Sequence, residues 1–200
     1  MLLHGEVMKI SGFQTFSLNE YPKEISAIIF TQGCNFSCRY CYNPELQPLE
    51  VSDQSYMDVG SILEQLKVRS KDLTAVTITG GEPLLQEGIM EFLSEMRAMG
   101  YKTKINTNGS CYMRLKYIIE NNLVDFIRMD VKAPSDKYED IVCCSVKMDT
   151  IEKSIKLVKN SGIDHEFHTV MDEDVLDEED VKKIRKWIKD DKNYKVGEKK

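Results

Sequence analysis

Three cysteines in one short segment are the residues of this sequence best suited to chemistry. Cys34, Cys38 and Cys41 lie in the segment GCNFSCRYCYNPEL with the spacing C-x3-C-x2-C. A tight loop with this spacing can point three sulfur atoms inward, and thiolates are the ligands that iron–sulfur clusters prefer. A 4Fe–4S cluster with three protein thiolates leaves one iron without a side-chain ligand. Such an open position distinguishes catalytic from structural metal sites.

Two other interpretations of these cysteines stay open at this point. The thiols could bind zinc together with a distant cysteine or histidine, or they could simply be buried. Their location favours the cluster, because the loop directly follows residues 25–31, an apolar and β-branched run that predicts a buried strand. Proteins of the α/β class place their chemistry at the carboxyl ends of strands.

Polar residues also follow the next predicted strands. Strand 73–79 is followed by Gly80, Gly81 and Glu82. The glycines permit close backbone approach to a ligand, and the carboxylate can accept hydrogen bonds from an ammonium group. The later strands add Asn106, Asn108, Asp130, Lys132 and, inside the fifth strand, His168. Taken singly, each of these is as well explained by a solvated turn, an ion pair or a structural histidine.

Together these motifs resemble a known group of enzymes. The cysteine spacing with Tyr40 just before Cys41, followed by Gly-Gly-Glu-Pro at 80–83, resembles the radical S-adenosylmethionine (SAM) superfamily. The resemblance implies a 4Fe–4S cluster on Cys34, Cys38 and Cys41, and S-adenosylmethionine as the second cofactor. The residues that it implies for cofactor binding are Tyr40, Gly80, Gly81, Glu82, Asn106, Asn108, Asp130, Lys132 and His168.

One branch of the superfamily is especially similar. Segments 9–21, 43–46 and 129–134 (MDVKAP) resemble the anaerobic ribonucleoside-triphosphate reductase activating proteins, which are glycyl-radical-enzyme activases. This implies reductive cleavage of the cofactor to a 5′-deoxyadenosyl radical that removes hydrogen from a glycine of a large partner enzyme. It also implies a flavodoxin- or ferredoxin-like electron donor. The sequence departs from the family at residues 19–23 (NEYPK) and at His168, where an arginine is usual.

Two alternatives from other functional classes are kept. The chain could be a radical SAM enzyme acting on a small molecule, similar to 7-deazaguanine synthases. It could instead be a zinc- or iron–sulfur-binding protein without catalysis. The remaining cysteines, Cys111, Cys143 and Cys144, lie outside the motif, and we interpret them as incidental.

The pattern of elements predicts an α/β fold with a parallel sheet. Predicted strands at 25–31, 73–79, 101–105, 124–131 and 163–170 alternate with helices near 59–66, 89–96, 115–119, 151–158 and 181–188. The family resemblance implies a partial (βα)6 TIM-like barrel with a short or incomplete last strand.

We expect a lead-in at 1–24, with 1–7 as an upstream extension. We expect the radical SAM core at 25–190 and a frayed, charged tail at 191–200, in which 194–196 could at most add a weak strand. For the helix starts, Ser52 is a candidate cap, and Asp149 with Glu152 resembles a capping box.

The charge and hydropathy of the sequence argue against nucleic-acid and membrane partners. The 200 residues carry a formal net charge of −6, with a sequence pI of about 5.2, which argues against nucleic-acid binding through a basic surface. No apolar run approaches the roughly 20 residues of a membrane-spanning helix. The amino terminus does not have the pattern of a secretory signal, so we expect a cytoplasmic protein with reduced thiols and no membrane partner.

Overall fold

A sheet of seven strands in sequential order forms the frame of the computed structural model, which describes residues 8–52 and 56–198. The first strand pairs antiparallel with the second, and every later neighbour pairs in parallel. The strands are β1 (Ile10–Ser17), β2 (Ser26–Thr31), β3 (Ala75–Gly80), β4 (Lys102–Thr107), β5 (Phe126–Asp130), β6 (Asp164–Met171) and β7 (Tyr194–Glu198).

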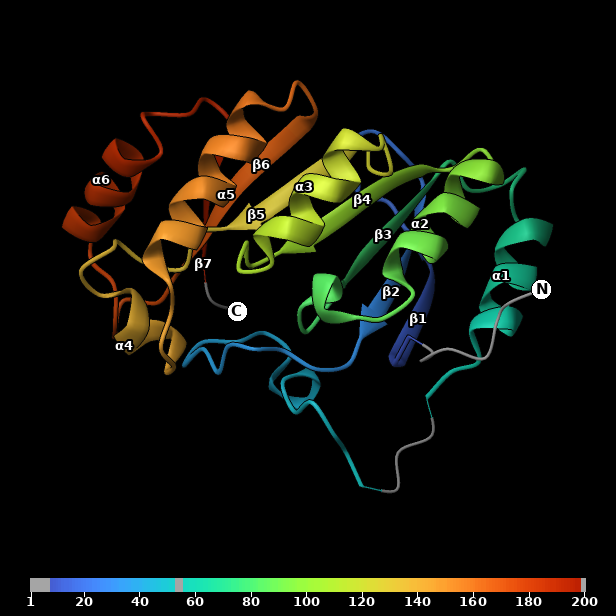
Figure 1. Ribbon diagram of the computed structural model, residues 1–200, viewed down its shortest axis with the longest axis horizontal. Coiled ribbons are helices and arrows are strands. Elements are labelled where there is room, and N and C mark those ends of the chain that lie inside the picture. Colours follow the sequence, from blue (N-terminus) through green and yellow to red (C-terminus); the bar gives the residue numbers. More distant parts are fainter. Residues whose placement is uncertain (1–7, 53–55, 199–200) are drawn as a thin grey trace.

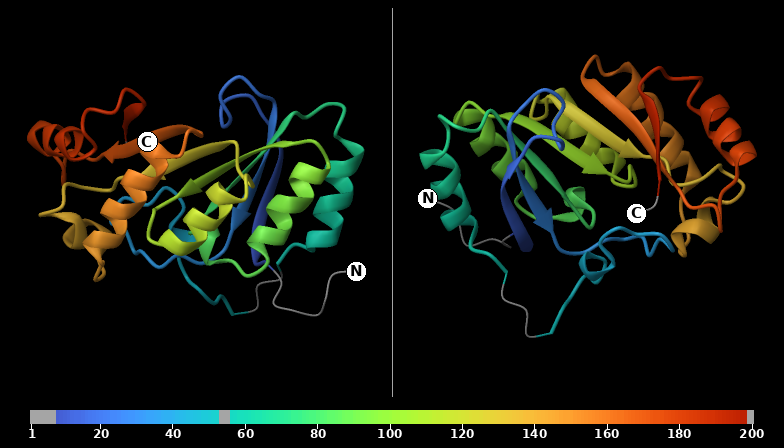
Figure 2. Two further views of the ribbon diagram at one scale, coloured as in Figure 1. Left: turned by 45° about the horizontal axis from the view of Figure 1, so that its top comes forward. Right: turned by 180° about the vertical axis from the view of Figure 1, so that it is seen from behind.

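The helices lie against one face of this curved sheet (Figures 1 and 2). They are α1 (Val59–Val68), α2 (Ile89–Ala98), α3 (Tyr112–Glu120), α4 (Tyr138–Val142), α5 (Met148–Asn160) and α6 (Glu178–Trp187), with 3-10 turns at Pro44–Leu46 and Pro83–Leu85. The right view of Figure 2 shows the opposite, concave face, which is not covered by helices. The sheet does not close on itself, so the predicted partial barrel is confirmed.

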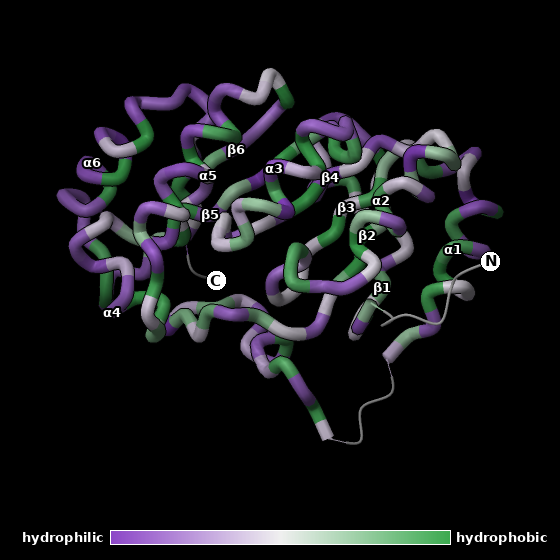
Figure 3. The backbone as a smooth tube through the Cα atoms, in the orientation of Figure 1, coloured by the Kyte–Doolittle hydropathy of each residue, from purple (hydrophilic) through white to green (hydrophobic). Residues whose placement is uncertain are grey.

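Alternation along the strands explains these two faces. On β5, Ile127 and Met129 are fully buried in the hydrophobic core, whereas Arg128 and Asp130 line a cavity on the other face. Figure 3 shows apolar residues recurring along the strands and on parts of each long helix. The helices therefore pack on the apolar face and leave the polar face open.

The five predicted strands are confirmed as β2 to β6, but both edges of the sheet differ from expectation. Strand β1 forms within the predicted lead-in, whose first seven residues lie outside the described part of the chain. The chain end, expected to be a frayed tail, pairs with β6 as β7. Tyr194 explains the second difference, because its ring is buried and its hydroxyl donates to Thr169 Oγ1 at 2.9 Å.

Two predicted caps are wrong. Asp58, rather than Ser52, caps α1, and its carboxylate accepts from Ser61 N at 2.7 Å. Helix α5 begins after Lys147 and has no side-chain cap, so Asp149 and Glu152 do not form a capping box. Within the described ranges, no helix combines the length and apolar character needed to cross a bilayer.

Candidate functional site

The cysteine loop crosses the carboxyl edge of the sheet from β2 to α4 (Figure 1). Its near side is held by Cys34 N, which donates to Gln47 O at 2.9 Å. On its far side, Ser37 N donates to Val142 O at 3.0 Å and Arg39 N to Ile141 O at 3.2 Å. The loop therefore takes its shape from a helix that lies about one hundred residues later in the chain.

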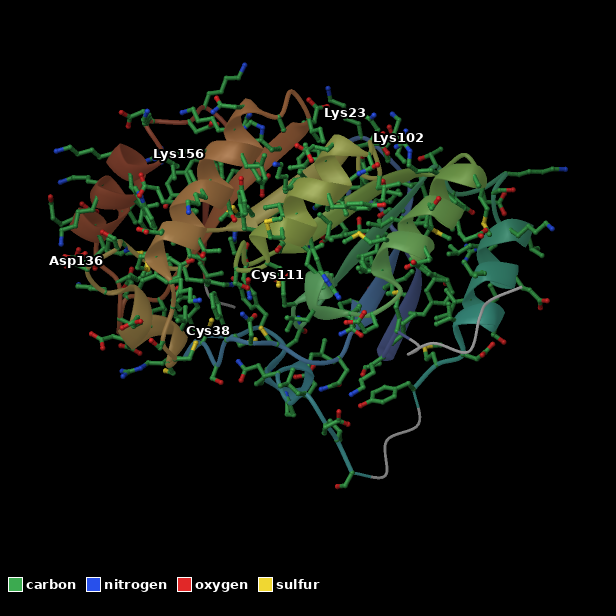
Figure 4. The ribbon with its side chains drawn as sticks, viewed as in Figure 1. Lys23, Cys38, Lys102, Cys111, Asp136 and Lys156 are labelled. Carbon is green, nitrogen blue, oxygen red and sulfur yellow. The ribbon has the colours of Figure 1, made fainter. Side chains whose placement is uncertain are left out.

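All three thiols of the motif line one cavity at this edge. Burial raises the pKa of Cys34 to about 12 and that of Cys38 to about 11, so both thiols are neutral at pH 7 in the absence of metal. Metal binding would therefore release protons. Figure 4 labels Cys38 on the loop close to α4.

The described residues contain no group of three or more His, Cys, Asp or Glu side chains drawn close enough together to bind a single ion. Cys111, at the start of α3 (Figure 4), and the pair Cys143–Cys144 do not line the cavity.

Gly80 and Gly81 line the cavity, but their lack of side chains serves the protein itself. A Cβ on Gly80, whose φ is +118°, would lie 2.3 Å from Thr31 N and O. A Cβ on Gly81 would lie 2.1 Å from Gly33 O. The glycines let the end of β3 pack directly on the end of β2 and on the backbone of the cysteine loop, while the predicted close approach of a ligand stays a prediction.

Glu82 lies behind the cavity wall, at the end of β3. Its side chain is fully buried and does not line the cavity. Its carboxylate accepts from Leu84 N at 3.1 Å, from Thr107 Oγ1 at 2.8 Å and from Asn108 N at 2.7 Å. Burial raises the pKa of Glu82 to about 7, although these donors oppose the shift. The carboxylate therefore ties the end of β3 to the end of β4, and its predicted contact with the cofactor stays a prediction.

Asn106 and Asn108 bring the end of β4 into the cavity lining. The Asn106 Nδ2 group donates to Glu20 Oε1 at 2.8 Å and to Thr79 Oγ1 at 3.2 Å. Its buried Oδ1 has no hydrogen-bond partner among the described residues. An unpartnered buried acceptor of this kind is satisfied by a ligand that offers an N–H or O–H group.

Asp130 and Lys132 form a close pair at the end of β5, with Lys132 Nζ 2.6 Å from Asp130 Oδ2. Burial by itself would raise the pKa of Asp130, but the charge of Lys132, with His168 and Arg128, outweighs it and lowers the pKa. The hydroxyl of Tyr40 donates to the backbone oxygen of Lys132, which fixes the tyrosine against β5. These three residues line the cavity as predicted.

His168 does not line the cavity. Its ring is buried, with Nδ1 3.6 Å from Asp130 Oδ1 and Nε2 packed under Gly197 of β7. Strand β7 covers this position, and the predicted contact of His168 with the cofactor stays a prediction. Two charged residues of the cavity lining were missed, Arg128 and Glu20. Arg128 could have been found, since it lies two residues before Asp130 and so on the same strand face.

The comparison with known families agrees with this arrangement. The family model described as the radical SAM superfamily matches residues 28–188, from β2 to the end of the last helix. The chain belongs to the radical SAM superfamily. The resemblance inferred from the cysteine loop is thereby confirmed, and the chain is a radical SAM enzyme.

Curated radical SAM relatives include activating enzymes. A Methanocaldococcus jannaschii protein, named as a candidate glycyl-radical enzyme activating enzyme, is 34% identical over 192 residues, which cover 94% of this chain and 78% of the relative. The pyruvate formate-lyase-activating enzyme of Listeria monocytogenes is 32% identical over 116 residues, or 54% of this chain and 47% of that enzyme.

A solved structure titled native anSMEcpe with bound AdoMet shares the fold. Its TM-score is 0.64 at 19% identity, and the match covers 84% of this chain and 49% of the other. The chain thus spans about half the length of that structure and of the Listeria enzyme.

Membership of the superfamily implies a 4Fe–4S cluster and S-adenosylmethionine, and the residues present fit both. Three thiols facing one cavity supply the soft ligands that iron–sulfur clusters require. The unpartnered Oδ1 of Asn106 offers an acceptor to an organic cofactor with amine and hydroxyl groups.

Proposed function

We propose that this protein is a glycyl-radical-enzyme activating enzyme that uses Cys34, Cys38 and Cys41 as the thiolate ligands of its cluster. The observation that carries the proposal is that the three thiols line the same cavity as the ends of β3, β4 and β5. Three protein ligands leave a fourth coordination position for the amino and carboxylate groups of S-adenosylmethionine.

Once bound, the cluster and cofactor supply reductive cleavage of a carbon–sulfur bond, which yields a 5′-deoxyadenosyl radical for hydrogen abstraction. The chain's own residues hold and shield these groups. Asn106 Oδ1 accepts a hydrogen bond from the cofactor, and the Asp130–Lys132 pair orients it beside β5. Phe36 and Tyr40, both buried in the cavity wall, exclude water.

The proposed substrate is a backbone glycine of a large partner enzyme, for which an anaerobic ribonucleotide reductase is the first candidate. The name of the M. jannaschii relative supports a glycyl-radical enzyme as the partner, and the resemblance in residues 9–21 and at MDVKAP supports the ribonucleotide reductase in particular. The concave face without helices (Figure 2) can admit a polypeptide loop. The proposed electron donor is a flavodoxin- or ferredoxin-like protein.

A small-molecule substrate is the second candidate. A Helicobacter pylori protein named GTP 3′,8-cyclase is 28% identical over 159 residues and matches 74% of this chain. A glycyl radical detected by electron paramagnetic resonance in a co-incubated ribonucleotide reductase would support activation of a partner enzyme. Consumption of a small metabolite without any partner protein would support the second candidate.

Replacing Cys38 by alanine tests the site itself. Anaerobically reconstituted wild-type protein should bind about four iron and four sulfide per chain and release 5′-deoxyadenosine with dithionite. Cys38→Ala should lose both properties while keeping its helical circular dichroism, because the loop lies outside the sheet. The matched control is Cys143→Ala, since Cys143 is exposed and does not line the cavity, and it should keep both. Wild-type protein that binds zinc in place of iron, or Cys38→Ala that still cleaves the cofactor, would refute the assignment.

A further inference from the structure

The sulfurs of Cys34 and Cys38 differ in the hydrogen bonds that they receive. Cys34 Sγ accepts from Phe36 N at 3.4 Å and from Asn108 Nδ2 at 3.8 Å. Over all residues that the structure describes, the hydrogen bonds of Cys38 end at its backbone oxygen, and its Sγ has no donor. Cluster binding would turn this partly buried, neutral thiol into a thiolate, and a buried anionic sulfur is stabilised by hydrogen-bond donors. As a cluster ligand, Cys38 therefore needs a donor that the neutral thiol does not have.

The hydroxyl of Tyr138, the first residue of α4, lacks an acceptor. Tyr138 is fully buried, and no hydrogen bond joins its hydroxyl to any other residue described in the structure. Its ring makes edge-to-face contacts with Phe36 and Trp187, at 6.4 and 6.1 Å between ring centroids, so its neighbours on these sides are aromatic. A buried hydroxyl without an acceptor is destabilising, and native proteins rarely keep one without a partner. The Tyr138 hydroxyl therefore indicates an acceptor that the cluster-free polypeptide does not offer.

Tyr138 and Cys38 belong to one packed unit. The amides on either side of Cys38 donate to the carbonyls of Ile141 and Val142, which end α4. Figure 4 shows Cys38 beside this helix, and Tyr138 lies one helical turn before Val142 on the same face. Burial raises the pKa of the Tyr138 hydroxyl, the backbone of Lys132 opposes the rise, and negative charge on Cys38 would raise the pKa further. A thiolate at Cys38 would therefore keep the phenol protonated, as a hydrogen-bond donor must be.

We propose that Tyr138 is a positioning residue of the cluster and donates a hydrogen bond from its hydroxyl to Cys38 Sγ. The inference rests on the proposed ligation of the cluster by Cys38, and it adds a residue that lies outside the cavity lining and outside the cysteine motif. Hydrogen bonds to cluster sulfurs help to set the reduction potential, because they stabilise the extra negative charge of the reduced form. Lys132 is less suited as the donor, since its Nζ is held 2.6 Å from Asp130 Oδ2. Tyr138 therefore makes the cluster easier to reduce.

Tyr138→Phe tests this role, because it removes the hydroxyl and keeps the ring. Cluster-loaded wild type and variant would be titrated anaerobically with dithionite at controlled potentials, and the reduced cluster would be measured by its electron paramagnetic resonance signal. At the potential where half of the wild-type cluster is reduced, the ratio of reduced to oxidised cluster should be about three- to tenfold lower in Tyr138→Phe. For a one-electron couple this equals a decrease of about 28–59 mV in the reduction potential. The iron and sulfide contents should equal those of wild type.

Tyr101→Phe is the matched control. Tyr101 is buried like Tyr138, but its hydroxyl donates to Leu66 O and its side chain does not line the cavity. Tyr101→Phe should lower the urea midpoint of unfolding, since a buried hydrogen bond is lost, and should leave the reduction potential unchanged. Cluster-free Tyr138→Phe should show the opposite effect on stability, with a urea midpoint at or above that of wild type, because it loses no hydrogen bond and buries one polar group fewer.

A second measurement reports on the hydrogen bond itself. Transfer into heavy water should shift the iron–sulfur stretching bands in the resonance Raman spectrum of wild type, because the exchanged hydroxyl proton is bonded to a ligand sulfur. The shift should be smaller in Tyr138→Phe, which keeps the donors at Cys34, and unchanged in Tyr101→Phe. An equal shift in wild type and Tyr138→Phe would refute the hydrogen bond even if the two reduction potentials differed.

The outcomes separate this inference from the proposed function. Wild-type protein that binds zinc in place of a cluster would overturn both. Wild-type protein with an intact cluster, together with a Tyr138→Phe variant of the same reduction potential, would overturn the role of Tyr138 alone. A Tyr138→Phe variant that binds no cluster, or a potential lowered as much in Tyr101→Phe, would also overturn that role, because the effect would then come from the shape of the loop or of the fold.

Discussion

Glu82 follows β3 and Asp130 ends β5, and the two carboxylates have opposite surroundings. Glu82 is fully buried among three protein donors, and burial raises its pKa to about 7. Asp130 lines the cavity beside Lys132. The charge of Lys132 outweighs the effect of burial and lowers the pKa of Asp130. The end of β3 therefore supports the cavity wall through buried contacts within the protein, whereas the end of β5 presents charged side chains to the cavity.

Gly81→Ala should have the largest effect on cluster binding and stability, because it disrupts the packing of the end of β3 on the cysteine loop. The new Cβ would lie 2.1 Å from Gly33 O and force the cysteine loop away from β3. We expect loss of cluster binding and destabilisation by at least about 3 kcal/mol, measured by iron content and urea unfolding. Gly60→Ala in α1 is the control, with stability expected within about 1 kcal/mol of wild type. Normal iron content in Gly81→Ala would show that the packing of β3 on the loop does not position the thiols.

Glu82→Ala should destabilise the fold more than it weakens cofactor binding to the protein that remains folded. The change leaves the amides of Leu84 and Asn108 without their acceptor in a buried site, which costs about 2–3 kcal/mol in the free energy of unfolding. Glu87→Ala is the control, because the Glu87 carboxylate is half exposed and pairs with Arg114 on the surface, and it should cost less than about 1 kcal/mol. A stable Glu82→Ala variant with weakened cofactor affinity would restore the direct contact that the sequence predicted.

The pH dependence of stability should differ in sign between the two carboxylates. The raised pKa of Glu82 means that its contribution is fully present below about pH 4.5 and is lost as the pH rises through about 7. The stability advantage of wild type over Glu82→Gln should therefore fall by roughly 2 kcal/mol between pH 5 and pH 7. The lowered pKa of Asp130 gives the opposite pH dependence. The stability advantage of wild type over Asp130→Asn should therefore be lost as the pH falls below about 4. If urea unfolding showed the same dependence of stability on pH for Glu82→Gln and Asp130→Asn, the contrast between the two carboxylates would be contradicted.

The sequence was informative where residue type and strand position act together. The cysteines, the two glycines and the pair Asp130–Lys132 each follow a strand with a strong apolar pattern, so parallel packing had to bring them to one edge. What a side chain does at that edge was harder to predict. Glu82 turns into the protein because donors from β4 and from its own turn surround it, and those contacts depend on tertiary packing.

The edges of the sheet were the weak point of the sequence prediction. Strand β1 carries mostly exposed or half-buried residues, and β7 depends on the single buried ring of Tyr194, so neither shows a clear apolar run. Without a firm prediction of β7, the sequence did not show that His168 would be covered, since its ring lies beneath Gly197 of that strand. Arg128 was overlooked for a different reason, since a lone arginine within a strand shows no pattern until its place in the cavity wall, between Asp130 and Glu166, is seen in three dimensions.

The hydrogen bonds from Ser37 and Arg39 to α4 also set an order of events during folding. A nascent chain has made its cysteine loop long before residues 141 and 142 exist to receive these donors, and contacts so distant in sequence form late. The loop can therefore reach its final shape only after β3, β4 and β5 have been made and α4 has docked. Iron and sulfide would then enter a nearly finished protein, and insertion of the cluster would act as a check that the sheet has been assembled as far as its fifth strand.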